Sequence, residues 1–535
     1  MKKTLFSFVA IVLFILATVS CQTGTTDNSY QNAIPANVSG VLAIRLQQMA
    51  DKAELNESTK AQVLQILKDG MKSQNTEKLE KIFKDPEESG ISLKSPIIVF
   101  FETPQGAVVT GQSKTPSGIF FKSSQNQGLV AKTSSTSKLD DLFAAMKNEG
   151  IDVTSTSKNG YTEIVSENLV CTYNGETVLM LFTSGNPAAT QEQAAAYMAQ
   201  NESQSALSNK FYKKAIEKGS DLSGCVSMAS YQELIRTTMK GMPNFSFIQD
   251  STVWEDLYLL GELNFEKGNI RTEITYEANE KATLEKFKQF SFMGQKQSNK
   301  FLNRFPASTL YYVGSSLNGE KLYELAAPQL ETLPAAIDRE KLKHLITSIN
   351  GDFSFGITKL GMMNLPSVLL YAEVKDEYPM TYIQEQLKDQ MTFTPNGDNA
   401  VKGIIPMLNM TIYMGVQKGQ LYITNDPDLY ARIDKSAENP LGNTPQGGDM
   451  KNSYSCAFIN FSAINQMPIV QMAVSKAGPQ AAILKNMLNA LDYMEAFAPT
   501  ETKAIWNLFL TDKTQNSLKT ITSGAEQLLP LISSK

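Results

Sequence analysis

The sequence predicts an α+β protein built as two similar units, with largely antiparallel sheets and helices packed on them. The first observation is an internal repeat. Residues 34–37 (Ile-Pro-Ala-Asn) and 305–308 (Phe-Pro-Ala-Ser) both precede a short β-prone run and a leucine that leads into helix-forming sequence, at an ungapped offset of 306 − 35 = 271. The second is the length of 535 residues, which suits two cores better than one.

Further landmarks recur in the same order in the second half. A hairpin signal followed by Asn186-Pro187 has its counterpart before Asp426-Pro427, at an offset of 427 − 187 = 240. Cys225 and Cys456 each lie in an apolar strand pattern after that point. Changing offsets place insertions and deletions in loops, where they are tolerated. We therefore predict an internal duplication, with one unit at residues 35–300 and the other at 301–535.

In the first unit, β-prone runs alternate with amphipathic stretches. A helix is predicted at residues 137–149, because Ser137 can cap it and Leu139, Leu142, Phe143 and Met146 share one face. Asn174-Gly175 indicates a type I′ hairpin. The other expected strands are 41–46, 96–101, 107–110, 119–121, 169–173, 178–182 and 268–272, and the other expected helices are 47–53, 59–71, 78–84 and 188–199.

The second unit repeats this alternation. Leu342, Leu345, Ile346 and Ile349 recur with helical spacing. A later helix containing Ile383, Leu387 and Met391 is expected to match the helix around Leu139. The expected strands are 353–357, 368–372, 411–415, 421–423 and a closing strand at 516–520.

The first twenty residues have the pattern of a secretory signal. Lys2 and Lys3 precede an apolar stretch at residues 5–16 that is too short to span a bilayer, and small or β-branched residues precede Cys21. This pattern resembles the bacterial lipoprotein signal, which implies cleavage after residue 20 and acyl chains such as palmitate on Cys21. Several acyl chains would give a stable membrane anchor. Residues 21–34 are then expected to form the lipidated cysteine and a flexible tether.

Composition and charge narrow the classes of partner. The hydrophobic content of 42% and charged content of 19% are those of a globular protein. A net charge of −5 gives no electrostatic reason for binding nucleic acid or an anionic membrane surface. Cys171, Cys225 and Cys456 remain besides Cys21, and their spacing fits no metal motif, so we expect small buried apolar residues.

The sequence predicts no catalytic residue, no metal site and no cofactor. His344 is the only histidine, and the phosphate-loop, dinucleotide and serine-elbow motifs are absent from the sequence. Carboxylate pairs remain as acid–base candidates: Asp426 with Asp428, Asp85 with Glu87, and Glu255 with Asp256. Asp426 before Pro427 is better explained as a helix cap, and residues 396–399 as a turn.

Methionine is abundant, with 22 residues, several of them in apolar loops at residues 242–247, 361–366 and 404–408. Such loops either form an adaptable apolar binding surface or cover the ends of a core.

Taken together, Cys21, the entry at residues 34–37 and the Asn-Pro or Asp-Pro helix starts resemble a family of large Bacteroidetes lipoproteins with a domain of unknown function. The resemblance implies a lipid-anchored protein of the cell envelope, in the outer membrane. It does not decide between the periplasmic face and the cell surface. We expect a non-enzymatic protein that binds an apolar ligand or an envelope protein. The alternatives are a carboxylate-dependent hydrolase of envelope or dietary glycan and an envelope scaffold without a ligand.

Overall fold

The computed structural model describes most of the chain and contains two compact units. The described residues are 28–55, 61, 81–82, 85–102, 127–148, 152–182, 187–232, 251–289, 291, 293–330, 337–360, 365–405, 410–476, 478 and 481–526. Unit 1 comprises Met1–Thr237, Glu255–Thr272 and Asp512–Lys535, and unit 2 comprises Thr238–Trp254 and Glu273–Thr511.

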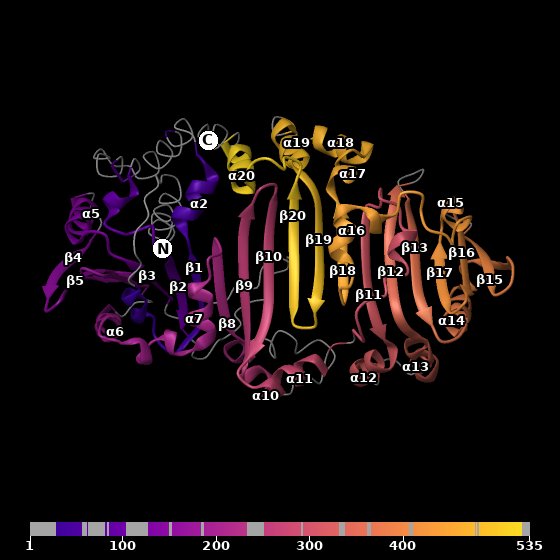
Figure 1. The fold of residues 1–535 in the computed structure, drawn as a ribbon, viewed down its shortest axis with the longest axis horizontal. Coiled ribbons are helices and arrows are strands. Elements are labelled where there is room, and N and C mark those ends of the chain that lie inside the picture. Colours follow the sequence, from indigo (N-terminus) through magenta and orange to yellow (C-terminus); the bar gives the residue numbers. More distant parts are fainter. Residues whose placement is uncertain are drawn as a thin grey trace. The chain divides into compact units, whose positions relative to one another are not determined.

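Unit 1 is an antiparallel sheet with helices packed against it (Figure 1). Its strands are β1 (Val38–Ile44), β2 (Ile97–Glu102), β3 (Gln127–Lys132), β4 (Thr154–Lys158), β5 (Tyr161–Ser166), β6 (Leu169–Tyr173), β7 (Thr177–Phe182), β8 (Leu222–Ser227) and β9 (Leu257–Glu266). They pair in the order β9-β8-β1-β2-β3-β7-β6-β5-β4. Its helices are α2 (Leu46–Ala53), α5 (Thr136–Asn148), α6 (Pro187–Met198), α7 (Lys210–Glu217) and α20 (Ser517–Glu526).

Unit 2 has the same order of pairing. Its strands are β11 (Tyr311–Asn318), β12 (Ile349–Leu360), β13 (Pro366–Val374), β14 (Thr392–Pro395), β15 (Ala400–Ile405), β16 (Met410–Gln417), β17 (Gln420–Thr424), β18 (Ser455–Asn460), β19 (Leu491–Thr500) and β20 (Lys503–Leu510). They pair antiparallel as β20-β19-β18-β11-β12-β13-β17-β16-β15-β14. Its helices are α11 (Lys281–Gln289), α12 (Gly319–Leu330), α13 (Arg339–Ser348), α14 (Tyr378–Leu387), α15 (Pro427–Tyr430), α16 (Pro445–Met450), α17 (Phe461–Asn465), α18 (Pro468–Ser475) and α19 (Ala481–Ala490). The short helix α10 (Ser251–Glu255) and strand β10 (Asn269–Ala278) span the boundaries between the units.

The predicted α+β class and the largely antiparallel sheets are confirmed. Most elements with a clear period lie where they were expected, including α5 and the hairpin β6–β7. The strands β3, β4, β5, β9, β14, β15, β19 and β20 were not among those expected. Strands β4 and β14 are short and polar, whereas β9 and β19 are long and have no clear alternation of buried and exposed residues. The expected strand at 516–520 is wrong: the Asn516 side chain accepts a hydrogen bond from the Leu518 amide at 3.0 Å and begins helix α20.

The first strand of each unit is central, and the segment before it is buried. Strand β1 lies between β2 and β8, and β11 lies between β12 and β18. Ile34 and Phe305, which precede the repeated prolines, each have 0% of their surface exposed. The Ile34 carbonyl accepts from the Ala206 amide at 3.0 Å and the Phe305 carbonyl from the Leu441 amide at 2.8 Å. Both entry segments are thereby tied to a distant loop.

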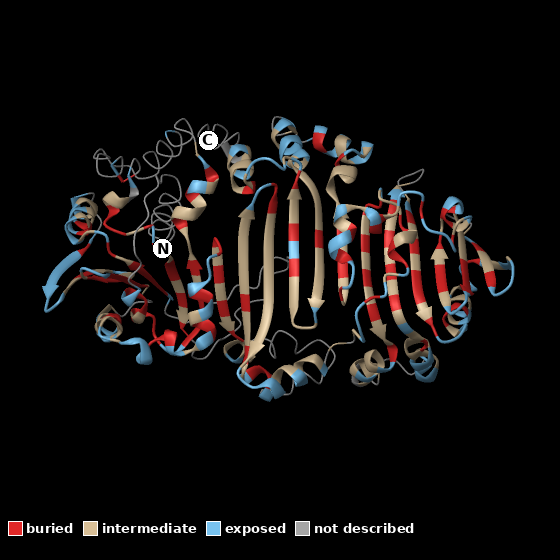
Figure 2. Cartoon of the chain, viewed as in Figure 1, coloured by how far each residue is buried: buried red, intermediate tan, exposed pale blue. Residues whose placement is uncertain are grey.

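Each sheet has a hydrophobic cluster on both faces. Neighbouring residues of a strand point to opposite faces. On β7, Leu179 belongs to one cluster and Val178 to the other, and on β13 Tyr371 and Ala372 are divided in the same way. Figure 2 shows the resulting bands of buried residues across the strands. The helices and loops therefore cover both faces of the central strands.

Two domain expectations differ from these units. The units are discontinuous, because α20 packs with unit 1, where the Thr522 hydroxyl contacts the Ala53 carbonyl at 3.4 Å. The last part of the expected tether is also packed: Tyr30 is 1% exposed and its hydroxyl donates to the Pro96 carbonyl at 2.8 Å. Cys21, the signal segment, the expected helix at 59–71 except residue 61, and the expected strands at 107–110 and 119–121 lie outside the described residues.

We expect Phe305→Ala to lower the free energy of unfolding by about 3–5 kcal/mol, because the ring is fully buried and its loss leaves a cavity. Urea unfolding would measure this change. Ile337→Ala is the control, since Ile337 is 37% exposed and should change stability by less than about 1 kcal/mol. Equal effects of the two substitutions would contradict the role given to Phe305.

Candidate functional site

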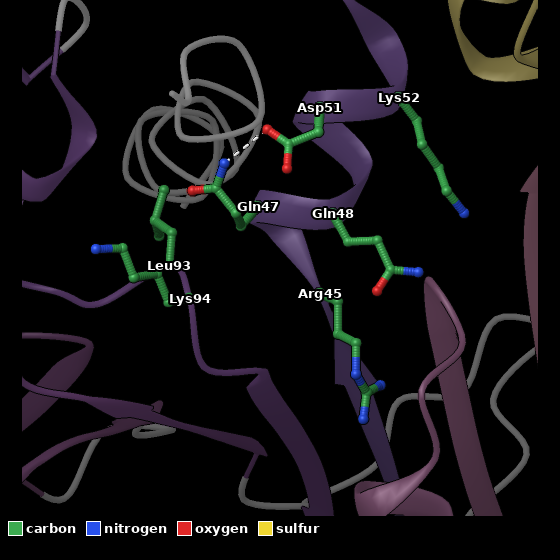
Figure 3. A pocket seen from close by; sticks show the side chains of 7 residues that line it. All are labelled: Arg45, Gln47, Gln48, Asp51, Lys52, Leu93 and Lys94. Atoms are coloured by element: carbon green, nitrogen blue, oxygen red, sulfur yellow. Dashed lines mark hydrogen bonds between the residues drawn. The ribbon is translucent and has the colours of Figure 1, made fainter. Parts of the chain in front are cut away.

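A hollow of about 320 Å³ lies beside helix α2 in unit 1. It is lined by Arg45, Gln47, Gln48, Asp51, Lys52, Leu93 and Lys94 (Figure 3). The helix begins directly after the central strand β1, so side chains of its first turns stand at the end of the sheet. Three of the lining residues are basic and one is acidic, which gives the hollow a positive balance.

Arg45 is used by the chain itself. Its guanidinium donates to the carbonyls of Ile216 at 2.7 Å and Ser220 at 3.0 Å, and to the Ser223 hydroxyl at 3.2 Å. Burial lowers the pKa of Arg45, opposed by its attraction to Tyr30 and Asp221. The arginine therefore joins α2 to the segment that leads into β8.

Asp221 is the acidic centre beside this hollow and is 0% exposed. Gln48 and Lys52 are one helical turn apart and both reach it: Gln48 Nε2 at 2.7 Å from Oδ1, and Lys52 Nζ at 2.6 Å from Oδ2. The Phe265 amide donates to the same carboxylate at 2.6 Å. Its two oxygens thus accept from three groups, and the arrangement fastens β8 and β9 to α2.

The remaining polar groups of the hollow face one another or water. Gln47 Nε2 donates to Asp51 Oδ1 at 2.7 Å, one turn along the helix (Figure 3). Lys94 is exposed on the segment opposite. Sequence reasoning missed this site, because Arg45 and Asp221 are 221 − 45 = 176 residues apart and lie in no motif.

The carboxylates named as candidates for acid–base chemistry have structural partners. Asp426 caps α15, as predicted, by accepting from the amides of Asp428 at 2.9 Å and Leu429 at 3.3 Å. Lys359 Nζ lies 2.9 Å from its other oxygen. Burial raises the pKa of Asp426, but the bonds from Lys359 and from the backbone amides outweigh it and hold this pKa below its usual value. A carboxyl that is ionised so readily is a poor general acid.

Two residues of the other pairs have local or exposed positions. Asp85 accepts from the Glu87 amide at 3.1 Å and caps a short 3-10 helix, so it too supports local structure. Glu255 is exposed at the end of α10. The turn predicted at residues 396–399 is confirmed, because it connects β14 to β15 and has Gly397 at a φ of 105°.

His344 lies on α13 with its side chain 49% exposed, but it is not a purely solvated residue. Its Nε2 is 2.8 Å from Asp376 Oδ2, and its ring stacks on Tyr378 at 3.9 Å between centroids. The Ser348 hydroxyl and the Tyr378 amide also donate to Asp376. The cluster joins the end of α13 to the start of α14.

The three cysteines are buried, as predicted. Burial raises the pKa of the Cys456 thiol to about 11, which disfavours the reactive thiolate. Cys225 pairs with Val41 in the sheet, while Cys456 pairs with Gly314. At the offset of 271, Val41 corresponds to Tyr312, whose partner is Phe458. The two cysteines therefore lie on corresponding strands, β8 and β18, but at positions that differ by two residues.

Two further findings concern metals and membranes. Within the described ranges, no three His, Cys, Asp or Glu side chains are grouped closely enough to share a metal ion. Among the helices of those same ranges, none has the length and apolar content needed to cross a bilayer.

Comparison with protein families gives one assignment. Residues 30–518 match the family described as a domain of unknown function, DUF4836. The chain belongs to this family. The match begins at the buried entry segment of unit 1 and ends in α20, so it includes nearly all the elements described above.

Curated proteins and solved structures add less about this DUF4836 member. No curated protein matches it. Crystal form III of TP0453 is similar at a TM-score of 0.27 and 12% identity, covering 48% of this chain and 82% of that one. Crystal form I of TP0453 gives 0.26 and 11%, with 48% and 80% covered.

We expect Asp221→Asn to destabilise the protein by about 3–5 kcal/mol, because it leaves the Lys52 charge without its buried partner. Urea unfolding would measure the loss. The control is Glu202→Gln, which breaks the exposed ion pair with Lys213 and should cost less than about 1 kcal/mol. Similar unfolding midpoints for both variants would rule out the structural role of Asp221.

The Asp426–Lys359 pair predicts a pH dependence. Because the folded-state pKa of Asp426 lies below the usual value of about 4, the pair stabilises the fold above that value and the gain is lost as the pH falls through the folded pKa. Asp426→Asn keeps an oxygen for the cap but removes the charge. The difference in unfolding free energy between the unsubstituted protein and Asp426→Asn should be largest above about pH 5 and shrink below about pH 4. A difference that stays constant with pH would exclude this account.

Proposed function

We propose that this protein is a lipid-anchored component of the bacterial cell envelope that acts by binding and not by catalysis. The anchor is Cys21, and the outer membrane is the proposed site. The main support for a binding role is that Asp221 beside the hollow and the acid–base candidate Asp426 are both ion-paired and hydrogen-bonded within the fold. Both carboxylates connect helices to strands. We therefore propose that the protein acts by binding a partner or ligand at its surface.

The anchor is supported by the arrangement of residues 1–34. A basic start and an apolar stretch precede Cys21, and the packed part of the chain begins close behind, at Tyr30. The tether would therefore span only about eight residues, 22–29, or at most about 28 Å when extended. A domain held this close to a bilayer would act at the membrane surface or on neighbouring envelope proteins.

We also infer that the two units arose by duplication. Nine strands of unit 1 and nine of unit 2 follow one order of pairing, from β9 to β4 and from β19 to β14. Pro35 and Pro306, the repeated prolines, each form an isolated antiparallel bridge, with Ser205 and Pro440. The same elements serve the same purpose in both units, which supports descent from a single ancestral unit.

The test of the anchor is Cys21→Ala in the full-length chain, expressed in a bacterium that processes lipoproteins. The unsubstituted protein should be recovered in the membrane fraction with an added acyl mass, and the variant should be released or retained with its signal segment. Cys225→Ala is the control, because Cys225 is buried and should leave both acylation and fractionation unchanged. Membrane recovery of Cys21→Ala with the same acyl mass would refute the proposal.

A further inference from the structure

The helices α18 and α19 of unit 2 expose large apolar side chains. Ile469 and Met472 on α18 are 44% and 56% exposed, and Leu484 and Met487 on α19 are 39% and 49% exposed. Each pair is spaced by three residues, so it forms one helix face. No residue of α19 is buried, although the helix is rich in alanine, leucine and isoleucine. An apolar helix with no fully buried residue leaves much of its apolar surface exposed to solvent.

Polar contacts hold these helices to the sheet of their own unit. The Asn465 side chain donates to the Leu488 carbonyl and joins α17 to α19, and the Gln471 side chain donates to the Asn465 carbonyl. The Thr511 amide donates to the Ala490 carbonyl at 2.9 Å, beside the start of β19. Both α17 and α18 lie against α19, and Figure 1 places all three at one end of β18–β20. The exposed apolar residues therefore lie on helices that are held in place by hydrogen bonds and by packing within unit 2.

The charged residues within positions 461–490, which contain α17, α18 and α19, are all lysines, and Asp492 follows this stretch with its carboxylate accepting from the Ser462 hydroxyl of α17 at 2.9 Å. Lys476 follows the exposed face of α18 and Lys485 lies within α19, and both are exposed. Neither forms an ion pair with a residue that the structure describes. Exposed apolar side chains flanked by unpaired lysines match the interface of an anionic bilayer, where apolar groups enter the acyl boundary and lysines meet phosphates.

We propose that α18 and α19 form a lipid-binding surface that inserts Ile469, Met472, Leu484 and Met487 into the interface of a membrane containing anionic phospholipid. Its biological setting rests on the membrane location proposed above, although the contact does not require acylation. The flexible methionines Met472 and Met487 suit an irregular lipid boundary. The surface would hold unit 2 against the bilayer, as a second attachment besides Cys21.

The experiment uses residues 22–535, which contain every described residue but lack Cys21 and its acyl chains. Flotation would measure their binding to vesicles of phosphatidylethanolamine with phosphatidylglycerol, compared with phosphatidylcholine alone. The unsubstituted chain should bind the anionic vesicles. The double variant Met472→Glu with Met487→Glu should bind at least about tenfold more weakly, because each change puts a charge where an apolar group enters the interface. Lys476→Gln should weaken binding about fivefold and only on anionic vesicles.

The matched control is Ile404→Glu, which places the same charge at a residue of β15 that is 40% exposed and belongs to the same unit. It should bind vesicles as the unsubstituted chain does. Urea unfolding checks that all variants are folded. As a second measurement, Met487→Cys labelled with an environment-sensitive fluorophore should shift to the blue on vesicles.

Three results would overturn the proposal: no binding of the unsubstituted chain to vesicles, equal loss of binding in Ile404→Glu, or self-association through this face in place of vesicle binding. Self-association abolished by the methionine substitutions would assign the face to a second copy of the chain. These results are independent of the anchor, since the tested chain has no acyl group. Failure of the Cys21→Ala test would likewise leave the vesicle result unchanged.

Discussion

Each unit depends on burying the segment that precedes its central strand. Ile34 and Phe305 have no exposed surface, and their carbonyls accept hydrogen bonds from Ala206 and Leu441, far along the chain. The strands that follow, β1 and β11, each take one neighbour from nearby sequence and the other from sequence more than a hundred residues away. Closing loops of this length costs chain entropy, which the burial of the entry segment and its hydrogen bonds to the distant loop help to offset.

Buried charged groups also connect β1 and the helix after it to distant parts of the chain. Lys52 and Gln48 on α2 reach Asp221 before β8, while Arg45 binds the carbonyls of the same segment. A buried carboxylate is stable only when its oxygens are fully engaged, and here they are. The hollow beside α2 thus lies next to the polar contacts that connect α2 to the segment before β8. The charged groups beside this hollow stabilise the fold of unit 1.

The exposed apolar residues place any binding activity at the periphery. Of the methionine-containing loops predicted from the sequence, residues 242–247, 361–364 and 406–408 lie outside the described part of the chain. Met472 and Met487 are exposed instead on two helices, whose only charged residue is Lys485 and which are linked through Lys476. A protein that is attached through Cys21 and also binds lipid through unit 2 would present its remaining surfaces in a defined orientation.

The sequence by itself determined the features that depend on local pattern. Helical spacing located α5 and α13, Asn174-Gly175 located the hairpin β6–β7, and Asp426 before Pro427 located a helix cap. The similarity of the segments at residues 34–37 and 305–308 is visible in the sequence at an ungapped offset of 271. Only the tertiary structure decided that Arg45 and Asp221 meet, that residues 516–520 begin a helix, and that α18 and α19 expose large apolar side chains. Periodicity reports which face of an element is apolar, whereas the partner of that face depends on contacts between residues far apart in the chain.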